Sequence, residues 1–231
     1  MAAGSGFPKA SSRLPRSPLT TQKVPAFPVY VFDIDGTLLD SAADICGAIS
    51  DALTPHVPEP PPFEYLKKFV GYHLDVCFQE VLPHYTREQL DRLIHDYRAI
   101  YPVRKHAATR RYPGVLETLQ RLQGRKGTAT TKGTPMTRAV LEQFELIPYF
   151  DHVQGTDGFP CKPEPDVVLR TIAALGANPD DCLFVGDSAA DMEAGRRAGV
   201  QTCAVRYGYG NFEDMARWQP DYWISSLTEL L

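Results

Sequence analysis

The sequence predicts an α/β fold in which a doubly wound parallel sheet carries helices on both of its faces. One observation predicts this sheet, and a second predicts an insertion into it. From residue 112 to the end of the chain, short apolar runs typical of buried strands alternate with amphipathic helices. Repeated units of this length need right-handed crossovers, which place helices on both faces of a parallel sheet. A block of helical periodicity over residues 42–111 interrupts this rhythm and indicates an inserted all-helical region.

The first strand is expected at residues 29–32, which are fully apolar. Helices are expected to begin at residues 113–114 and at Thr134, with Thr134 as the N-cap and Pro135 in the first helical position. The segment 127–131 between them is small and polar, and propensity alone does not identify it as a strand. The later elements expected are a helix over 168–175, a strand at 182–185, a helix from Ser188 to Ala198, and strands at 201–205 and 222–224.

The inserted region carries helix-start signals of its own. Ser41 and Asp44 have the spacing of a capping box, and Thr86 and Gln89 repeat it before a helix with an apolar face. A further segment at 63–70 follows a proline-rich break. The expected organisation is a disordered extension over residues 1–27, a core formed by 28–41 and 112–231, and a helical cap over 42–111 inserted after the first strand.

Composition argues against several classes of protein. The net charge of the 231 residues is −4, and the first 32 residues contain four basic and no acidic side chains, so the remainder is more acidic still. A net-acidic body argues against nucleic acid as a partner. It suits a protein that holds a divalent cation. No stretch approaches the roughly 20 apolar residues of a membrane helix, so no membrane partner is expected.

Cysteine usage indicates the compartment. The five cysteines are scattered, odd in number and without a C-x-x-C pair, which indicates reduced thiols and a cytoplasmic protein. The N-terminal segment lacks the apolar region of a secretory signal, but its Ser and Arg content also fits an organelle transit peptide. A monomer or a homodimer is expected.

Two carboxylates follow the first strand. Asp33 and Asp35 come directly after the apolar run, and Gly36 lets the backbone turn sharply there. The carboxyl ends of the strands in an open α/β sheet are where ligands bind. Carboxylates this close repel each other unless a cation or a shared proton relieves them. One can attack phosphorus while the other moves a proton. Taken alone, the motif would fit an Asp-Gly turn with no catalytic role better than a catalytic pair.

Further polar clusters are expected near the same edge. They are, in chain order, Thr130, Thr131 and Lys132; then Lys162; and then Asp187 with Asp191. Acids, a lysine and a hydroxyl that converge on one crevice suit Mg²⁺ together with a phosphate. Lys132 is the alternative to Lys162 as the lysine of the site, but only Lys162 has neighbouring prolines that fix its backbone. Asp191 also has the spacing of a capping partner for Ser188.

Taken together, these motifs resemble those of the haloacid dehalogenase superfamily, phosphotransferases with a Rossmann-like core and an aspartate nucleophile. The likeness covers residues 29–231 and rests on three strings in the family's order and spacing: Asp33-x-Asp35-Gly36-Thr37, Lys162-Pro163-x-Pro165 and Gly186-Asp187-Ser188-x-x-Asp191. The strings at 33–41, 112–116 and 207–210 look like the phosphoglycolate phosphatase branch of that family.

The resemblance implies a role for each residue. Asp33 would form an aspartyl-phosphate, and Asp35 would protonate the leaving group and then activate water. Lys162 would stabilise the charge shared by Asp33 and the phosphate. The remaining implied roles are substrate contacts by Thr130, Gly36 and the backbone amide of Thr131, and Mg²⁺ binding by Asp33, the Asp35 carbonyl and Asp187, with Asp191 in support. Thr131 stands where the family commonly has Asn.

The cap of such proteins closes over the site, which implies a small phosphorylated metabolite as the partner. Gly71, Tyr72 and His73 lie where the cap loop would face the aspartates and are the candidate substrate contacts. The function expected is a Mg²⁺-dependent phosphatase, with 2-phosphoglycolate foremost. Three alternatives remain open: another small ester or pyrophosphate as the substrate, a β-phosphoglucomutase-like phosphomutase, and a non-catalytic binding module on the same fold. A metal-free dehalogenase is disfavoured because Asp35 is present.

Overall fold

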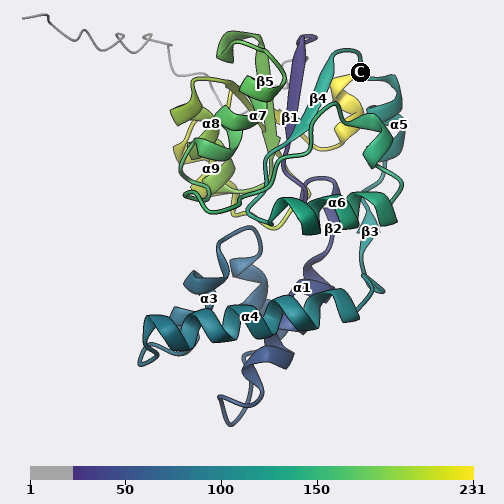
Figure 1. Ribbon diagram of the computed structural model, residues 1–231. Coiled ribbons are helices and arrows are strands. Elements are labelled where there is room, and N and C mark those ends of the chain that lie inside the picture. The colour runs from purple at the N-terminus through teal and green to yellow at the C-terminus, as the bar shows by residue number, and fades with distance from the viewer. Residues whose placement is uncertain (1–22) are drawn as a thin grey trace, which may run out of the picture.

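The computed structural model describes residues 23–231. Among these residues, five parallel strands form one sheet in the order β4-β1-β5-β6-β7 (Figure 1). The strands are β1 (Val29–Phe32), β4 (Arg125–Thr128), β5 (Cys182–Gly186), β6 (Gln201–Val205) and β7 (Tyr222–Ile224). The chain leaves β1 toward β4 on one side and returns to β5 on the other, so the strand order reverses at β1. The carboxyl end of β1 is therefore the point at which such sheets bind ligands.

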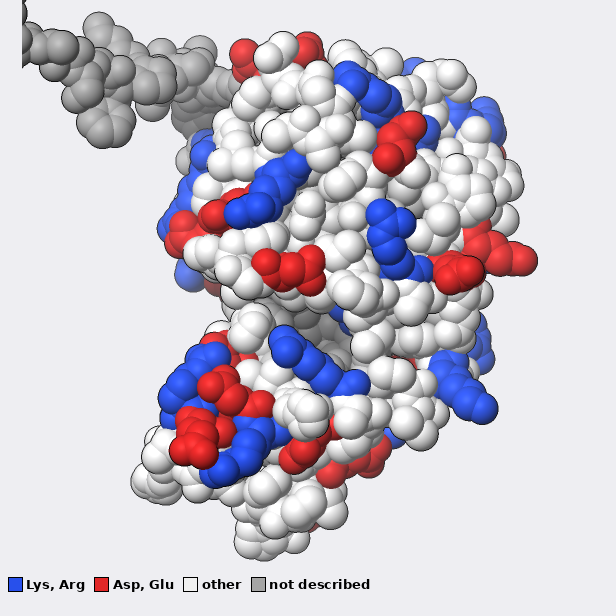
Figure 2. Space-filling model, viewed as in Figure 1, with Lys and Arg blue, Asp and Glu red and all other residues white. Residues whose placement is uncertain are grey.

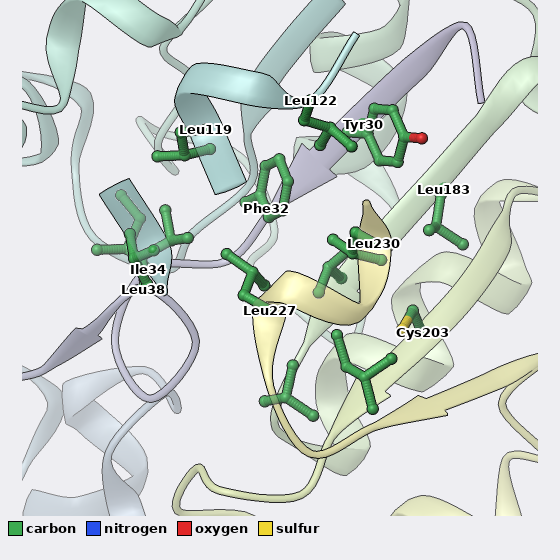
Figure 3. Close-up of a cluster of buried hydrophobic side chains, with 14 of the residues drawn as sticks. Tyr30, Phe32, Ile34, Leu38, Leu119, Leu122, Leu183, Cys203, Leu227 and Leu230 are labelled. Atoms are coloured by element: carbon green, nitrogen blue, oxygen red, sulfur yellow. The ribbon is translucent and has the colours of Figure 1, made fainter. Parts of the chain in front are cut away.

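Alternate side chains of β1 belong to two separate apolar clusters, because successive residues of a strand point to opposite faces. Tyr30 and Phe32 join the larger apolar cluster on one face (Figure 3). That face is covered by α5 (Val115–Arg121), α6 (Thr134–Gln143) and the 3-10 helix η4 (Leu227–Leu230). Val29 and Val31 join the cluster on the opposite face. That face is covered by α7 (Asp166–Ala174) and α8 (Ala189–Ala198), with α9 (Phe212–Arg217) beside α8. The predicted doubly wound α/β fold is confirmed.

The helices between β1 and β4 bury an apolar cluster of their own, below the sheet in Figure 1. They are α1 (Ala42–Leu53), α2 (Phe63–Leu66), the 3-10 helix η1 (Lys67–Phe69), α3 (Leu74–Val81) and α4 (Arg87–Val103). Two short antiparallel strands, β2 (Leu39–Asp40) and β3 (Arg110–Arg111), lie where the chain enters and leaves this region. Helix α3 was not expected from the sequence. The exact limits of a cap at 42–111 stay a prediction.

Most of the expected N-terminal extension, residues 1–27, lies outside the described residues. Its last part is not an extension, because Val24 and Phe27 are buried in the main core cluster. The backbone amide of Phe27 donates a hydrogen bond to the hydroxyl of Tyr30, which fixes this segment against β1. The folded core therefore begins a few residues earlier than the sequence predicted.

Two of the expected helix caps differ from the prediction. Helix α6 has Gly133 as its N-cap, one residue earlier than expected, because the hydroxyl of Thr134 instead accepts a hydrogen bond from the amide of Gly155. Helix α1 has Ser41 as its N-cap, but the Ser41 side chain makes no capping hydrogen bond. The capping boxes at the start of α4 and of α8 are present as expected.

The remaining short helices are η2 (Ile147–Tyr149) and η3 (Pro179–Asp181), both in connections around the sheet. All five cysteines are free thiols, and four of them are buried. Among the described helices, none has both the length and the apolar character that crossing a membrane requires.

Candidate active site

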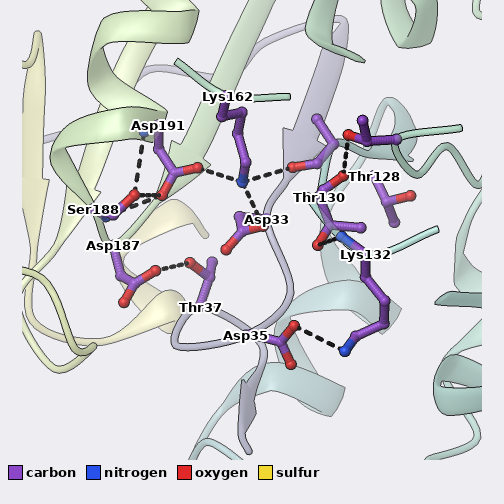
Figure 4. A network of polar contacts seen from close by, with 12 residues as sticks. Asp33, Asp35, Thr37, Thr128, Thr130, Lys132, Lys162, Asp187, Ser188 and Asp191 are labelled. Atoms are coloured by element: carbon purple, nitrogen blue, oxygen red, sulfur yellow. Dashed lines mark hydrogen bonds and ion pairs between the residues drawn. The ribbon is translucent and has the colours of Figure 1, made fainter. Parts of the chain in front are cut away.

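Lys162 connects two of the predicted acids. Its ammonium lies 2.7 Å from Oδ1 of Asp33 and 2.6 Å from Oδ1 of Asp191, and it also donates to the carbonyl of Ala129 at 3.1 Å (Figure 4). Asp33 follows β1 directly, whereas Asp191 lies in the first turn of α8. All three side chains are almost completely buried. Of the two candidate lysines, Lys162 is thus the one that contacts Asp33.

Asp191 serves as a helix cap and as a lysine partner at once. Its Oδ2 accepts hydrogen bonds from the amide and the hydroxyl of Ser188, at 3.0 Å and 2.6 Å, while its Oδ1 meets Lys162. Both carboxylate oxygens are therefore occupied by protein groups. The capping interpretation of Asp191 is confirmed, and its other carboxylate oxygen contacts Lys162.

Asp187 lies at the carboxyl end of β5, enclosed by glycines. Its Oδ2 accepts the backbone amide of Tyr209 at 2.7 Å, and its Oδ1 lies 3.4 Å from the hydroxyl of Thr37. A Cβ atom on Gly36 or on Gly208 would collide with the Asp187 side chain. Gly36 also has φ +92, a conformation that favours glycine. Glycine at these two positions lets both backbones approach the Asp187 side chain closely.

Asp33, Asp187 and Asp191 form a group that fits a divalent cation. One carboxylate oxygen from each lies within 4.8 Å of the others. Burial raises the pKa of Asp33 to about 7 despite the opposing charge of Lys162. Burial, and then the charges of Asp191 and Asp33, raise the pKa of Asp187 well above its usual value. Among the described residues, Lys162 is the one cation paired with this group. A bound divalent ion would relieve the remaining repulsion.

Asp35 faces away from that group and has partners of its own. The hydroxyl of Ser41 donates to Oδ1 at 2.6 Å, and the ammonium of Lys132 lies 3.3 Å from Oδ2. Figure 4 shows Asp35 and Lys132 below the cluster around Lys162. Burial acts to lower the pKa of Lys132, but Asp35, Tyr97 and Asp33 together outweigh it, so the pKa is raised overall. The two aspartates of the first motif thus occupy different electrostatic surroundings.

Thr130 and Thr131 follow β4 at the same edge of the sheet. The Thr130 side chain is buried, and its hydroxyl accepts the amide of Lys132 at a long 3.4 Å. Thr131 is partly exposed and lines a pocket. The backbone of Thr130 is held by the Thr156 hydroxyl, which donates to its carbonyl at 2.9 Å. Strand β4 begins at Arg125, two residues before the segment 127–131 that propensity alone did not identify as a strand.

A pocket of about 450 Å³ lies between the helical region and the loops that follow the strands. Figure 2 shows the molecule hollowed between its two parts. Gly71, Tyr72 and His73 line this pocket together with Asp35 and Thr131. The loop expected to face the aspartates therefore opens onto the same space as Asp35. The His73 ring is paired with Asp75 at 2.6 Å. Asp33, Gly36 and Lys162 are not among the lining residues.

Two functional candidates were missed by reasoning from the sequence. Ser41 was read as a helix cap, although its hydroxyl contacts Asp35. Tyr209 was noted only as part of a family string, although its amide contacts Asp187 and its hydroxyl accepts the amide of Ser41 at 2.6 Å. The usable signal was the Gly208-x-Gly210 pattern just after a strand, since glycines there allow one backbone to approach another closely.

A family model described as haloacid dehalogenase-like hydrolase matches residues 30–205. The chain belongs to this family. The family inferred from its motifs is thereby confirmed. A haloacid dehalogenase-like family hydrolase from Streptococcus pneumoniae has a similar structure, with a TM-score of 0.80 at 25% identity over 88% of this chain and 96% of that one. A Bacteroides fragilis protein described as a haloacid dehalogenase-like hydrolase has a TM-score of 0.84 at 29% identity over 89% of this chain and all of its own.

Relatives of this haloacid dehalogenase-like hydrolase carry two kinds of name. A phosphoglycolate phosphatase of Aquifex aeolicus is 32% identical over 88% of this chain and 94% of its own length. The pyrophosphatase PpaX of Anoxybacillus flavithermus is 30% identical over 87% of this chain and 94% of its own length. These relatives support the prediction that the chain is a phosphatase.

Proposed function

We propose that this hydrolase is a Mg²⁺-dependent phosphatase that acts on a small phosphate ester through a covalent intermediate on Asp33. The observation that carries the proposal is the contact of Lys162 with both Asp33 and Asp191. It gives a buried carboxylate a balancing charge beside an acidic cluster, at the edge of the sheet where ligands bind. The first candidate substrate is 2-phosphoglycolate, and another small ester or pyrophosphate is the alternative.

In the first half of the reaction, an oxygen of Asp33 bonds to phosphorus while the bond from phosphorus to the leaving oxygen breaks. Oδ1 of Asp33 is held by Lys162. No described residue donates a hydrogen bond to Oδ2, so its lone pairs are free. The ammonium of Lys162 balances the charge shared by the carboxylate and the phosphoryl oxygens. Asp35 gives its proton to the leaving oxygen, which departs as an alcohol.

In the second half, water attacks the phosphorus of the aspartyl-phosphate. Asp35, now ionised, takes the proton from that water, and inorganic phosphate leaves as the Asp33 carboxylate is restored. One residue thus acts first as an acid and then as a base. The Ser41 hydroxyl fixes the orientation of Asp35 through both steps. Dividing one difficult transfer into two easier ones is the advantage of the covalent route.

The donor set suits Mg²⁺ because it consists of oxygens. Asp33, Asp187 and the main-chain carbonyl of Asp35 would hold the ion, and Asp191 would support the site through Lys162. When bound, Mg²⁺ neutralises charge on the phosphoryl group and orients it. Thr130 and the amide of Thr131 would bind phosphoryl oxygens, with Gly36 close by. Gly71, Tyr72 and His73 would contact the rest of the substrate from a cap over residues 42–111.

Phosphate release from a panel of small esters, with Mg²⁺ and with EDTA, tests the proposal. We expect Mg²⁺-dependent turnover that Asp33→Asn abolishes, since an amide oxygen is a poor nucleophile. Asp96→Asn, a matched change at an exposed position on α4, should retain activity. Full activity in Asp33→Asn would overturn the assignment of the nucleophile. Equal rates with Mg²⁺ and EDTA would overturn the metal dependence.

A further inference from the structure

Lys132 is a nearly buried cation inside the pocket, outside the cluster around Lys162. Its side chain is 10% exposed, and it lines the pocket beside Thr131 and Tyr101. The ammonium lies 3.3 Å from Oδ2 of Asp35, 3.4 Å from the hydroxyl of Tyr101 and 4.5 Å from the centre of that ring. These contacts fix the position of a positive charge on the pocket wall.

Lys162 and Lys132 have different partners and different access to the pocket. Lys162 is fully engaged with Asp33 and Asp191 and does not line the pocket. Lys132 has one carboxylate partner, Asp35, and faces the space that a substrate would enter. Because Asp35 is the group that would protonate the leaving oxygen, the Lys132 ammonium lies within a few ångströms of the atoms just beyond that oxygen.

The walls around Lys132 are largely apolar. Ile45, Ile49, Tyr97 and Met136 line the same pocket, and the rings of Tyr97 and Tyr101 stack. An anion that meets an ammonium in such surroundings is attracted more strongly than in water. The other cation of the pocket, Arg98, is exposed at its rim and is screened by solvent. A buried second charge on a substrate would therefore be recognised by Lys132.

We propose that Lys132, with the hydroxyl of Tyr101, forms a subsite for a second anionic group of the substrate, so that the enzyme selects phosphate esters or anhydrides with another negative charge next to the leaving oxygen. The inference rests on the proposed phosphatase function and names the substrate class for it. The carboxylate of 2-phosphoglycolate and the second phosphoryl group of pyrophosphate both have this chemistry. The competing explanation is that Lys132 acts on Asp35 alone.

The test compares two esters that differ in one group. 2-Phosphoglycolate carries a carboxylate where 2-hydroxyethyl phosphate carries a neutral alcohol of similar size. The readout is the ratio of their kcat/KM values, because any effect of Lys132 on Asp35 is common to both esters and cancels. We expect wild type to favour 2-phosphoglycolate by about tenfold or more, and Lys132→Met to lower the ratio by about 10- to 100-fold, as for a lost hydrogen bond to a charged group.

Two further variants sharpen the comparison. Lys132→Arg keeps the charge and should keep most of the preference, whereas Arg98→Met at the rim should change the ratio little. Pyrophosphate hydrolysis should fall in parallel with that of 2-phosphoglycolate in Lys132→Met. Thermal unfolding of each variant shows whether it is folded.

Several results would overturn the subsite. Equal kcat/KM for the two esters in wild type would do so without any variant. A Lys132→Met protein in which both esters lose activity equally would assign Lys132 to Asp35 alone, with the phosphatase function intact. A ratio that falls in Arg98→Met but not in Lys132→Met would mean that Arg98, and not Lys132, recognises the second anionic group. Failure of wild type to hydrolyse any ester or pyrophosphate would remove the proposed function and the subsite together.

Discussion

The hydroxyl of Ser41 donates a hydrogen bond of 2.6 Å to Oδ1 of Asp35, although Ser41 is the N-cap residue of helix α1. The side chain of a serine in this position ordinarily accepts from the first turn of its own helix. Here the Ser41 side chain makes no such bond, and the amides of Ser41 and Ala42 donate to the hydroxyl of Tyr209. The start of α1 is thus connected to the proposed acid and base of the reaction.

Ser41→Ala should reduce turnover more than it reduces stability. The variant removes one donor from the Asp35 carboxylate, and a hydrogen bond to a charged group contributes about 1.5–3 kcal/mol, or roughly a 10- to 100-fold effect. We expect kcat to fall by about tenfold, at the low end of that range, with KM changed little. Because the side chain does not cap α1, the melting temperature should shift by only a few degrees. Steady-state kinetics and thermal unfolding measure both. An unchanged kcat together with a large loss of stability would mean that Ser41 has only a structural role.

The same residues explain why one prediction from the sequence was wrong. Ser41 and Asp44 have capping-box spacing, but spacing describes only local partners. In the structure, Ser41 is bonded to Asp35, and Asp44 accepts from the amide of Ala108 at 3.0 Å and the hydroxyl of Thr109 at 2.7 Å. Both side chains therefore form hydrogen bonds with residues outside the first turn of α1. The box of Thr86 and Gln89 forms as expected at a start of helix that is exposed to solvent.

The positions of the apolar strands were predictable from the sequence, whereas that of the polar strand was not. The limits of β1, β6 and β7 match the sequence analysis, because each is a short run of apolar or β-branched residues. Strand β4 was not identified because it reads Arg-Lys-Gly-Thr. It is an edge strand of the sheet, and a Cβ on Gly127 would clash with Thr171 of α7. Packing of α7 against β4 therefore needs a small residue at this position. Strand propensities take no account of such packing.

The convergence of Asp33, Lys162, Asp187 and Asp191 was predictable from their motifs, whereas their other partners were not. The prolines beside Lys162 favoured it over Lys132, and the contact between Lys162 and Asp33 agrees with that choice. Nothing in the sequence near Lys132 indicates that it would meet Asp35 and Tyr101, because Tyr101 comes from α4 in the inserted region. Contacts between distant segments depend on how the helices pack on the sheet.

Tyr209→Phe should destabilise the protein while leaving the Asp187 contact in place. The phenolic oxygen accepts the amides of Ser41 and Ala42 and donates to Asp40 at 2.8 Å, whereas Asp187 is bound through the Tyr209 backbone. Removing the oxygen leaves two amides without an acceptor, and we expect a loss of about 1–3 kcal/mol in the free energy of unfolding. Urea denaturation measures it.

The matched control for this variant is Tyr85→Phe. Its hydroxyl makes one exposed contact, 2.9 Å from the ring of His56, so its removal should change the free energy of unfolding little. Mg²⁺ affinity, measured by calorimetry, should be similar in wild type and in Tyr209→Phe. A marked loss of Mg²⁺ affinity in Tyr209→Phe would mean that the hydroxyl, and not the backbone amide alone, positions Asp187.

Lys162→Met should lower kcat strongly. The ammonium is the group that balances charge at Asp33, and loss of one such electrostatic contact typically lowers kcat by about 10²–10³-fold. Oδ1 of Asp191 would lose its partner at the same time, while Oδ2 would keep its bonds from Ser188. Lys126→Met, on β4, is the matched control. The Lys126 side chain is also buried, but its ammonium donates to the carbonyl of Gly124 and forms no ion pair with Asp33, Asp187 or Asp191. Comparable kcat values for the two variants would contradict the role given to Lys162.

The stability of the metal-free protein should fall as the pH rises from about 4 to 7. Burial raises the pKa of Asp33 from 3.8 to about 7 in the folded state. Between these two values the folded protein binds more protons than the unfolded chain does, so the free energy of unfolding decreases with rising pH. Asp187, with its pKa also raised by burial, acts in the same direction.

Mg²⁺ should oppose this loss, because it binds the ionised carboxylates and its affinity grows as they deprotonate. The gain in melting temperature on adding Mg²⁺ should therefore increase from pH 5 to pH 8, measured against a matched EDTA sample at each pH. In Asp33→Asn one titrating carboxylate is absent, so both the decline in EDTA and the gain with Mg²⁺ should be smaller. A gain that does not vary with pH in wild type would mean that the ion binds away from Asp33 and Asp187.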